Sequence, residues 1–145
     1  MKTRKISYFE WISAEEMHEQ SKDWFMQLNF IRDEQRFFQD LIKNHTLDIL
    51  DEKLFDESKK VVALLSEMEK SLIPLFKEVQ KHKNQLEIMV DDVDQPEMEK
   101  AYQKSHQNIS KKMGSYVVRY RSLKEKIFSL LKTVLKKRKR RRLLN

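Results

Sequence analysis

The sequence predicts an all-α protein, an antiparallel three-helix bundle of the coiled-coil type, and three observations lead to this prediction. The first is an apolar seam, a row of residues spaced alternately four and three apart, between Leu54 and Val93. A repeat of about 3.5 residues puts one narrow apolar stripe along a helix. The second is the scarcity of turn-forming residues, with one Gly and two Pro in 145 residues. The third is a charged fraction of 37%, which suits helices with wide solvated faces.

The first helix is expected over residues 14–50. Ser13, followed three residues later by Glu16, forms a capping box at its start. Its seam consists of Met17, Ser21, Trp24, Leu28, Ile31, Gln35, Phe38, Ile42, His45 and Ile49. Further apolar residues flank this seam, so the apolar arc is wide. Either the helix contacts two neighbours within the bundle, or Phe30 and Phe37 form the surface of a homodimer, because large exposed aromatic patches are uncommon on monomers.

The second helix carries the seam that organises the rest of the chain. Its positions are Leu54, Ser58, Val61, Leu65, Met68, Leu72, Leu75, Val79, His82, Leu86, Met89 and Val93, and all but Ser58 and His82 are apolar. Pro74 removes one helical hydrogen bond and crowds the preceding turn. Since the seam keeps its phase across Pro74, a kink is expected. If the helix instead breaks there, the fold becomes a four-helix bundle.

The third helix is expected to begin at Pro96, since proline is well tolerated in the first turn of a helix. Its seam is read as Met98, Tyr102, Ser105, Ile109, Met113, Tyr116, Tyr120, Leu123, Ile127, Leu130 and Val134, with one slip of phase near Gly114. A close approach of two helices is the expected reason for that glycine. The short connections make successive helices antiparallel neighbours. We therefore divide the chain into a bundle domain, residues 1–135, and a basic C-terminal tail, residues 136–145.

Charge is distributed very unevenly along the chain. The net charge is +7, and residues 136–142 are seven consecutive cations, namely Lys136, Lys137, Arg138, Lys139, Arg140, Arg141 and Arg142. Acidic residues instead crowd the first connection, at Asp48, Asp51, Glu52, Asp56 and Glu57. Part of the tail could therefore be neutralised by this acidic cluster, in the same chain or in a second copy.

The seven cations are the most specific functional signal in the sequence. Adjacent cations release the counterions of nucleic acid and give a salt-sensitive affinity that does not depend on base sequence. An acidic protein is the second candidate partner, and an anionic membrane surface is the third. The sequence has no apolar run long enough to span a membrane, so we expect a cytoplasmic protein. We therefore predict a helical interaction or scaffold module that forms a homodimer and has a polyanion-binding tail.

The histidines suggest an alternative function. When the three helices are laid antiparallel and joined by their short connections, His18, His82 and His106 fall at the same height along the bundle, one on each helix. Glu15, three residues before His18, forms a Glu-x-x-His pair with it. Helical bundles build metal sites from inward side chains on facing helices, and such a set would suit zinc or iron. However, only His82 lies on a seam, which favours a buried histidine bonded to a neighbour.

An enzyme is not expected. The chain has no cysteine, no glycine-rich phosphate loop and no nucleophile elbow, and its paired carboxylates fall on exposed positions. No cofactor is predicted for the same reasons.

Overall fold

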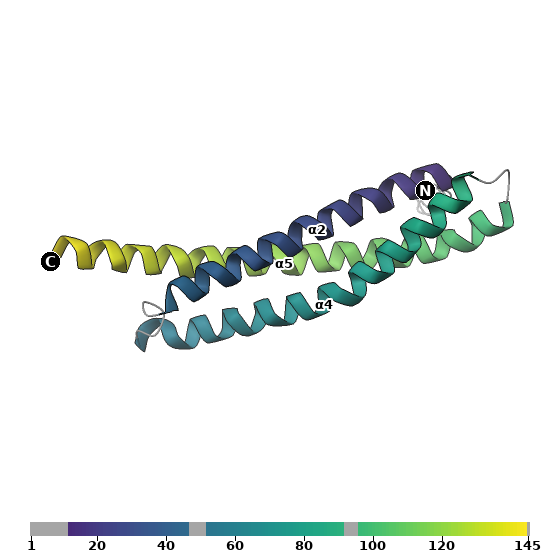
Figure 1. The fold of residues 1–145 in the computed structure, drawn as a ribbon. Coiled ribbons are helices and arrows are strands. Elements are labelled where there is room, and N and C mark those ends of the chain that lie inside the picture. Colours follow the sequence, from purple (N-terminus) through teal and green to yellow (C-terminus); the bar gives the residue numbers. More distant parts are fainter. Residues whose placement is uncertain (1–11, 47–51, 92–95, 145) are drawn as a thin grey trace, which may run out of the picture. The chain divides into compact units, whose positions relative to one another are not determined.

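The computed structural model describes residues 12–46, 52–91 and 96–144, and these residues form three helices. The helices are α2 (Ala14–Asn44), α4 (Glu52–Asp91) and α5 (Pro96–Leu144), drawn in Figure 1. No strand occurs in any of the three described ranges. The all-helical class predicted from the seams is therefore confirmed.

The chain divides into two compact units, each of which holds one stretch of every helix. The first unit combines the chain up to Asn29 with Ile73–Ser115. The second combines Phe30–Leu72 with the residues from Tyr116 onward. Each unit has its own polar and aromatic contacts between helices, so each is described separately below.

Pairs of contacts give the direction of the helices in each unit. In the first unit, His82 of α4 contacts His106 of α5, and Glu78 contacts Lys112, so these two helices run in opposite directions. In the second unit, Glu34 of α2 pairs with Tyr120 of α5, and the Phe38 ring meets the Phe128 ring. These contacts make α2 and α5 parallel neighbours there.

The start of α2 follows the predicted capping box. The backbone N–H of Glu16 donates to the Ser13 hydroxyl at 3.1 Å, which satisfies one of the unpaired donors of the first turn. The end of the helix differs from the prediction, because α2 ends at Asn44 and not at residue 50. After that point Thr46 bonds the carbonyl of Lys43 at 2.7 Å, and such local side-chain bonds compete with the helical pattern. Residues 47–51 lie outside the described part of the chain.

The seam of α4 is buried almost in full. Every predicted seam position from Leu54 to Met89 is buried, and Val93 lies outside the described residues. The two polar members, Ser58 and His82, are buried as well. The helix continues through Pro74 from Glu52 to Asp91, so the four-helix alternative is wrong for this chain.

The helix α5 begins at Pro96, as predicted. In its first turns, however, the buried residues are not the ones that the seam predicted. The prediction holds from Ile109 to Val134, where every seam residue is buried. Before Ile109 it is wrong, because Met98 and Ser105 are exposed, whereas Gln103 and His106 are 7% and 1% exposed. The prediction preferred apolar residues, but these two polar side chains are buried because both are hydrogen-bonded.

The reason proposed for Gly114 is also wrong. A Cβ added at Gly114 would meet no atom within 4 Å, and the residue is exposed. Among the described residues, no neighbouring helix therefore requires a glycine at this position. Gly114 instead lies next to the boundary between the two units, which falls after Ser115.

No described helix is both long enough and apolar enough to cross a membrane.

Candidate functional site

The seven predicted cations belong to the last turns of α5. Lys136–Arg142 continue the helix that began at Pro96, and the helix itself runs on to Leu144. Six of the seven are exposed and Lys137 is partly exposed. At about 1.5 Å per residue, these seven residues form a cationic helical segment on the order of 10 Å long. We call Lys136–Arg142 the cationic segment.

The register of the second unit places the cationic segment past the ends of the other two helices. The Tyr116 hydroxyl donates to the Met68 carbonyl at 2.7 Å, which sets α4 level with α5. Glu52, the first residue of α4, comes sixteen residues before Met68, and Lys132 comes sixteen residues after Tyr116. Lys132 is therefore level with the start of α4, and the cationic segment lies beyond it.

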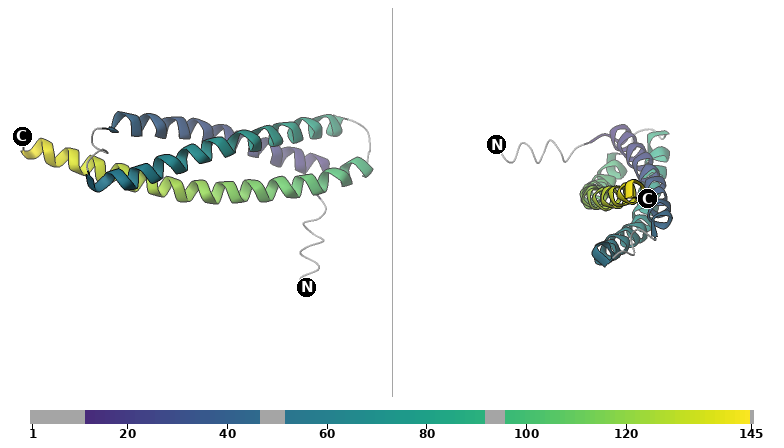
Figure 2. Two further views of the ribbon diagram at one scale, coloured as in Figure 1. Left: turned by 90° about the horizontal axis from the view of Figure 1, so that it is seen from below. Right: turned by 90° about the vertical axis from the view of Figure 1, so that its left-hand side faces the viewer.

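The same reasoning applies to α2. The ring of Phe38 meets the ring of Phe128 edge-on, with centroids 5.5 Å apart. Asn44, which ends α2, comes six residues after Phe38, so it is level with about residue 134. Figure 1 and the left view of Figure 2 show the yellow end of α5 extending past its neighbours in this unit. The cationic segment thus lies beyond the described ends of α2 and α4, with six of its seven residues exposed.

Two opposing electrostatic effects act on the cationic segment. Cations in the last turn of a helix, here Arg141 and Arg142, interact favourably with the partial negative charge of the helix end. Like charges three and four residues apart repel each other, however, and the segment contains several such pairs. A bound polyanion would remove this repulsion.

The predicted acidic cluster is only partly described by the structure. Asp48 and Asp51 lie outside the described residues, as does the side chain of Glu52. Asp56 and Glu57 are exposed on the first turns of α4. The neutralisation of the cationic segment by this cluster stays a prediction.

Two of the three predicted histidines meet in the first unit. The Nε2 atom of His82 lies 2.9 Å from Nδ1 of His106, and the Nε2 atom of His106 lies 2.7 Å from Oε1 of Gln20. The ring of Trp24 stacks on the ring of His106, with centroids 4.5 Å apart. His106 was expected to lie beside the seam, and its burial corrects that expectation.

Burial sets the protonation of this histidine pair. Burial, together with the smaller effect of the neighbouring His82, lowers the pKa of His106 from 6.5 to about 4. Burial also lowers the pKa of His82, against the opposing effect of the Glu78 carboxylate. Both rings are therefore neutral near pH 7, as members of a hydrogen-bonded core.

The four residues predicted for a metal do not form one group. His18 is partly exposed and Glu15 is exposed, whereas His82 and His106 are buried together. Within the described ranges, no cluster of three or more His, Cys, Asp or Glu residues could hold a metal ion. The pair is instead connected to neutral side chains, Gln20 and Trp24.

Two buried glutamines have hydrogen bonds that the sequence did not predict, because neither the seam position of Gln35 nor the polarity of Gln103 indicates a bonding partner. Gln103 of α5 bonds both the N–H and the carbonyl of Ile12, and so joins the start of α2 to α5. Gln35 of α2 donates to the Tyr116 hydroxyl at 2.9 Å. Both residues satisfy buried polar groups, so their role is to fix which parts of the helices meet.

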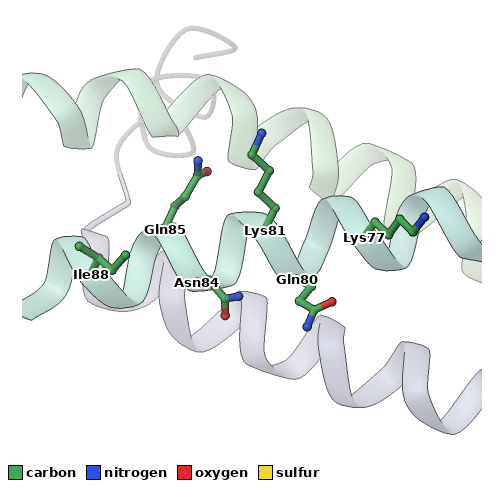
Figure 3. Close-up of a pocket in the computed structure, with 6 residues that line it drawn as sticks. All are labelled: Lys77, Gln80, Lys81, Asn84, Gln85 and Ile88. Carbon is green, nitrogen blue, oxygen red and sulfur yellow. The ribbon is translucent and has the colours of Figure 1, made fainter.

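The described surface also has a shallow hollow of about 390 Å³ on α4. Its lining residues are Lys77, Gln80, Lys81, Asn84, Gln85 and Ile88, and all of them come from this one helix. Figure 3 shows that their side chains diverge along the helix and do not converge on one point. Ligand sites usually enclose their ligand with a few convergent polar groups, so this hollow does not resemble one.

The two phenylalanines predicted at an oligomer surface are exposed. Phe30 and Phe37 are 67% and 58% exposed, and both stand on α2 in the second unit. The alternative role, packing against a second neighbour within the bundle, is therefore wrong for these two side chains.

Comparison with protein-family models, with curated proteins and with solved structures found no match for this chain.

Proposed function

We propose that this protein is a non-enzymatic helical scaffold whose cationic segment binds a polyanion, with nucleic acid as the partner. The observation that supports the proposal is the position of Lys136–Arg142, seven cations in helical turns beyond the ends of α2 and α4. A phosphate backbone can approach such a segment without displacing another helix. The affinity comes from the release of counterions condensed on the nucleic acid.

The helical form of the segment limits how many cations act at once. Seven successive residues cover nearly two helical turns and point to all sides. A duplex lying along one side would contact roughly four of them, so the logarithm of affinity should fall with the logarithm of salt with a slope of about −3 to −4. A flexible single strand that wraps the helix could contact more.

We expect the cationic segment to discriminate little between nucleic acids of different base sequence. The segment has no aromatic side chain on which a base could stack. We therefore propose that the protein binds the backbone and tolerates any sequence.

The rest of the chain acts as the scaffold in this proposal, and we propose that its helices pack as a coiled coil. Buried seam positions every three or four residues along α4 and along α5 from Ile109 support this packing. The seam presents a narrow apolar stripe, which leaves the charged faces of each helix available to partners. An intracellular location in the cytoplasm belongs to the same proposal.

The decisive experiment replaces all seven cations of the cationic segment by Gln and measures binding to duplex DNA and to single-stranded RNA over a salt series. The matched control removes the same charge from exposed lysines elsewhere, at Lys59, Lys60, Lys70, Lys77, Lys81, Lys104 and Lys111. We expect the segment variant to lose most of its affinity and its salt slope, and the control to keep most of both. Equal losses in the two variants, or no loss in either, would contradict the proposal.

Competition separates nucleic acid from the other two partner classes. We expect neither a polyglutamate peptide nor vesicles rich in phosphatidylserine to displace the nucleic acid at equal charge concentration. If the peptide binds more tightly than the nucleic acid, the partner is an acidic protein. If the vesicles do so, it is an anionic membrane surface.

A further inference from the structure

A patch of large apolar side chains is exposed where α2 and α5 lie side by side in the second unit. Phe30 and Phe37 of α2 are 67% and 58% exposed, and Phe128 and Leu135 of α5 are 54% and 53% exposed. Single exposed apolar residues are common on protein surfaces, but a group of this kind usually marks an interaction site. We call these four residues, with the charged residues next to them, the α2–α5 face.

The two halves of the face are joined through a buried ring. Phe38 is 1% exposed, and its ring lies 6.1 Å from the ring of Phe37 and 5.5 Å from that of Phe128, centroid to centroid. Phe37 and Phe128, one from each helix, therefore contact the same buried ring. A partner that covers one half would also reach the other.

Opposite charges flank the two halves. On α2, Asp33 and Asp40 stand four residues before and three residues after Phe37, and both are exposed. On α5, Lys132 stands four residues after Phe128, Arg121 stands seven before it, and both are exposed. Residues three, four and seven apart share one side of a helix. Exposed Arg36 shares that side of α2, three residues after Asp33, and exposed Glu125 shares that side of α5, three residues before Phe128. The α2 half thus carries two acids and one cation, whereas the α5 half carries two cations and one acid.

The levels of these charges match as well. The Tyr120 hydroxyl donates to Glu34 at 2.7 Å, and Phe38 meets Phe128, so α2 residues are level with α5 residues about 86 to 90 positions later. Asp33 is therefore level with Arg121. Asp40 is level with the turn between Phe128 and Lys132.

A second copy of this chain fits such a face under only one of two symmetries. A two-fold axis along the helices lays α2 of one copy on α5 of the other at the same level, so acidic residues face cations and Phe37 faces Phe128. A two-fold axis across the helices lays α2 on α2 and α5 on α5, which opposes like charges. A symmetric dimer uses the same patch on both subunits, so the patch must complement itself.

We propose that the α2–α5 face is the interface of a homodimer whose two-fold axis runs along the helices, with Asp33 and Asp40 of each copy opposite Arg121 and Lys132 of the other. The aromatic core of the interface is formed by Phe37 and Phe128 from both copies. This inference is independent of the proposed polyanion binding, because none of these residues belongs to the cationic segment.

Two charge-swapped variants test the proposal. One variant carries Asp33→Lys and Asp40→Lys, and the other carries Arg121→Glu and Lys132→Glu. By symmetry each variant alone opposes four pairs of like charges, so we expect its dimer to be weaker by roughly tenfold to a hundredfold. When the two variants are mixed, each copy regains opposite charges across the interface, so a heterodimer should form with an affinity close to that of the original chain.

The masses of the original chain, of each variant and of the mixture are measured by sedimentation equilibrium over a range of concentrations. The proposed geometry is supported if the mixture of the two variants dimerises as the original chain does while each variant by itself dimerises more weakly. A chain that stays monomeric at all concentrations overturns the proposal, and so does a dimer that is as stable in both variants as in the original chain. A mixture no more dimeric than the separate variants also overturns it.

The variant Phe37→Ser examines the apolar part of the interface. We expect it to weaken the dimer by roughly tenfold or more, because it removes an aromatic side chain from the centre of the contact. Phe37 is exposed within one chain, so the thermal unfolding of the dilute monomer should change little. The matched control is Val62→Ser, at an exposed apolar position of α4 away from this face, and it should leave the dimer intact. Equal effects of the two substitutions would contradict the assignment of the face.

Discussion

The Nε2 atom of His82 lies 2.9 Å from the Nδ1 atom of His106, and both side chains are buried between helices of the first unit. The second nitrogen of His106 lies 2.7 Å from the Oε1 atom of Gln20, which only accepts hydrogen bonds. The Nε2 atom of His106 must therefore donate, and its Nδ1 atom accepts from His82. Protonation of His106 would put a hydrogen on Nδ1, where the Nε2–H of His82 now donates, so the bond between the two rings would be lost unless the His82 hydrogen moved to its own Nδ1 atom.

This geometry predicts that the protein loses stability in mild acid. The pKa of His106 is lowered to about 4 in the folded chain, against 6.5 in the unfolded chain, so the unfolded chain takes up a proton first. The free energy of unfolding is then complete above pH 6.5 and falls as the pH decreases from 6.5 toward 4. The expected loss from His106 is on the order of 1.4 kcal/mol at about pH 5.5.

Urea denaturation at about pH 7.5 and about pH 5.5 measures this loss, in a range where most carboxylates stay ionised. The variant His106→Gln removes the titrating ring, so its stability should depend less on pH than that of the original chain. The variant His18→Gln, at a partly exposed position outside the pair, should keep the original dependence. An original chain with equal stability at both pH values would contradict the prediction.

The second unit contains a comparable buried contact, which predicts the cost of removing one hydroxyl group. The Tyr116 hydroxyl donates to the Met68 carbonyl at 2.7 Å and accepts from Nε2 of Gln35 at 2.9 Å. Tyr116→Phe leaves the Gln35 amide without its partner in the core, so we expect a loss of about 1–3 kcal/mol in the free energy of unfolding. Urea denaturation of the variant gives this value.

A double variant shows whether the loss arises from the contact. In Gln35→Leu with Tyr116→Phe, no donor is left unpaired, so the double variant should lose less than the sum of the two single variants. Strictly additive losses would mean that the two side chains act independently.

The periodicity of the seams predicted most of the fold because burial here follows apolarity. Along α4, each described seam residue is buried, including the two polar ones, since the apolar residues on both sides of them fix the phase of the helix. Pro96 marked the start of α5 because proline needs no hydrogen-bond acceptor in the first turn. The spacing of apolar residues and the position of Pro96 are both local signals, because each depends on residues close together in the sequence.

The first turns of α5 could not be predicted in the same way. Gln103 and His106 are buried because Ile12, Gln20 and His82 bond them, and these partners lie far away in the sequence. A rule that ranks residues by apolarity puts both on the surface. Level matching correctly paired His82 with His106, but it could not show which way His18 and Glu15 face, and these two side chains lie outside the buried pair.

The cationic segment predicts a change of helix content on binding. Repulsion between cations three and four residues apart destabilises the last turns of α5, and a bound polyanion removes that repulsion. Adding inorganic polyphosphate at low salt should therefore increase the helical signal in circular dichroism, and high salt without polyphosphate should have a smaller effect in the same direction. The seven-Gln variant should respond to neither. A signal that is constant under all these conditions would contradict the prediction.

The proposed dimer makes a prediction about salt, because a two-fold axis along the helices places both cationic segments at the same end of the assembly. Fourteen cations from two chains then repel each other across the axis. A chain truncated after Leu135 lacks this repulsion, so we expect it to form a tighter dimer than the full chain at an ionic strength of about 0.01 M, where the Debye length is about 30 Å. At about 1 M the Debye length is about 3 Å, and the two chains should dimerise equally well.

Sedimentation equilibrium of both chains at the two salt concentrations measures this difference. The seven-Gln variant is the matched control, since it keeps Leu143 and Leu144 and removes only charge, and it should behave like the truncated chain. An axis across the helices would place the two segments at opposite ends, where truncation has little effect on the dimer at any salt concentration. Equal dissociation constants for the full and truncated chains at low salt would therefore contradict the axis along the helices, because only that axis brings the two cationic segments together.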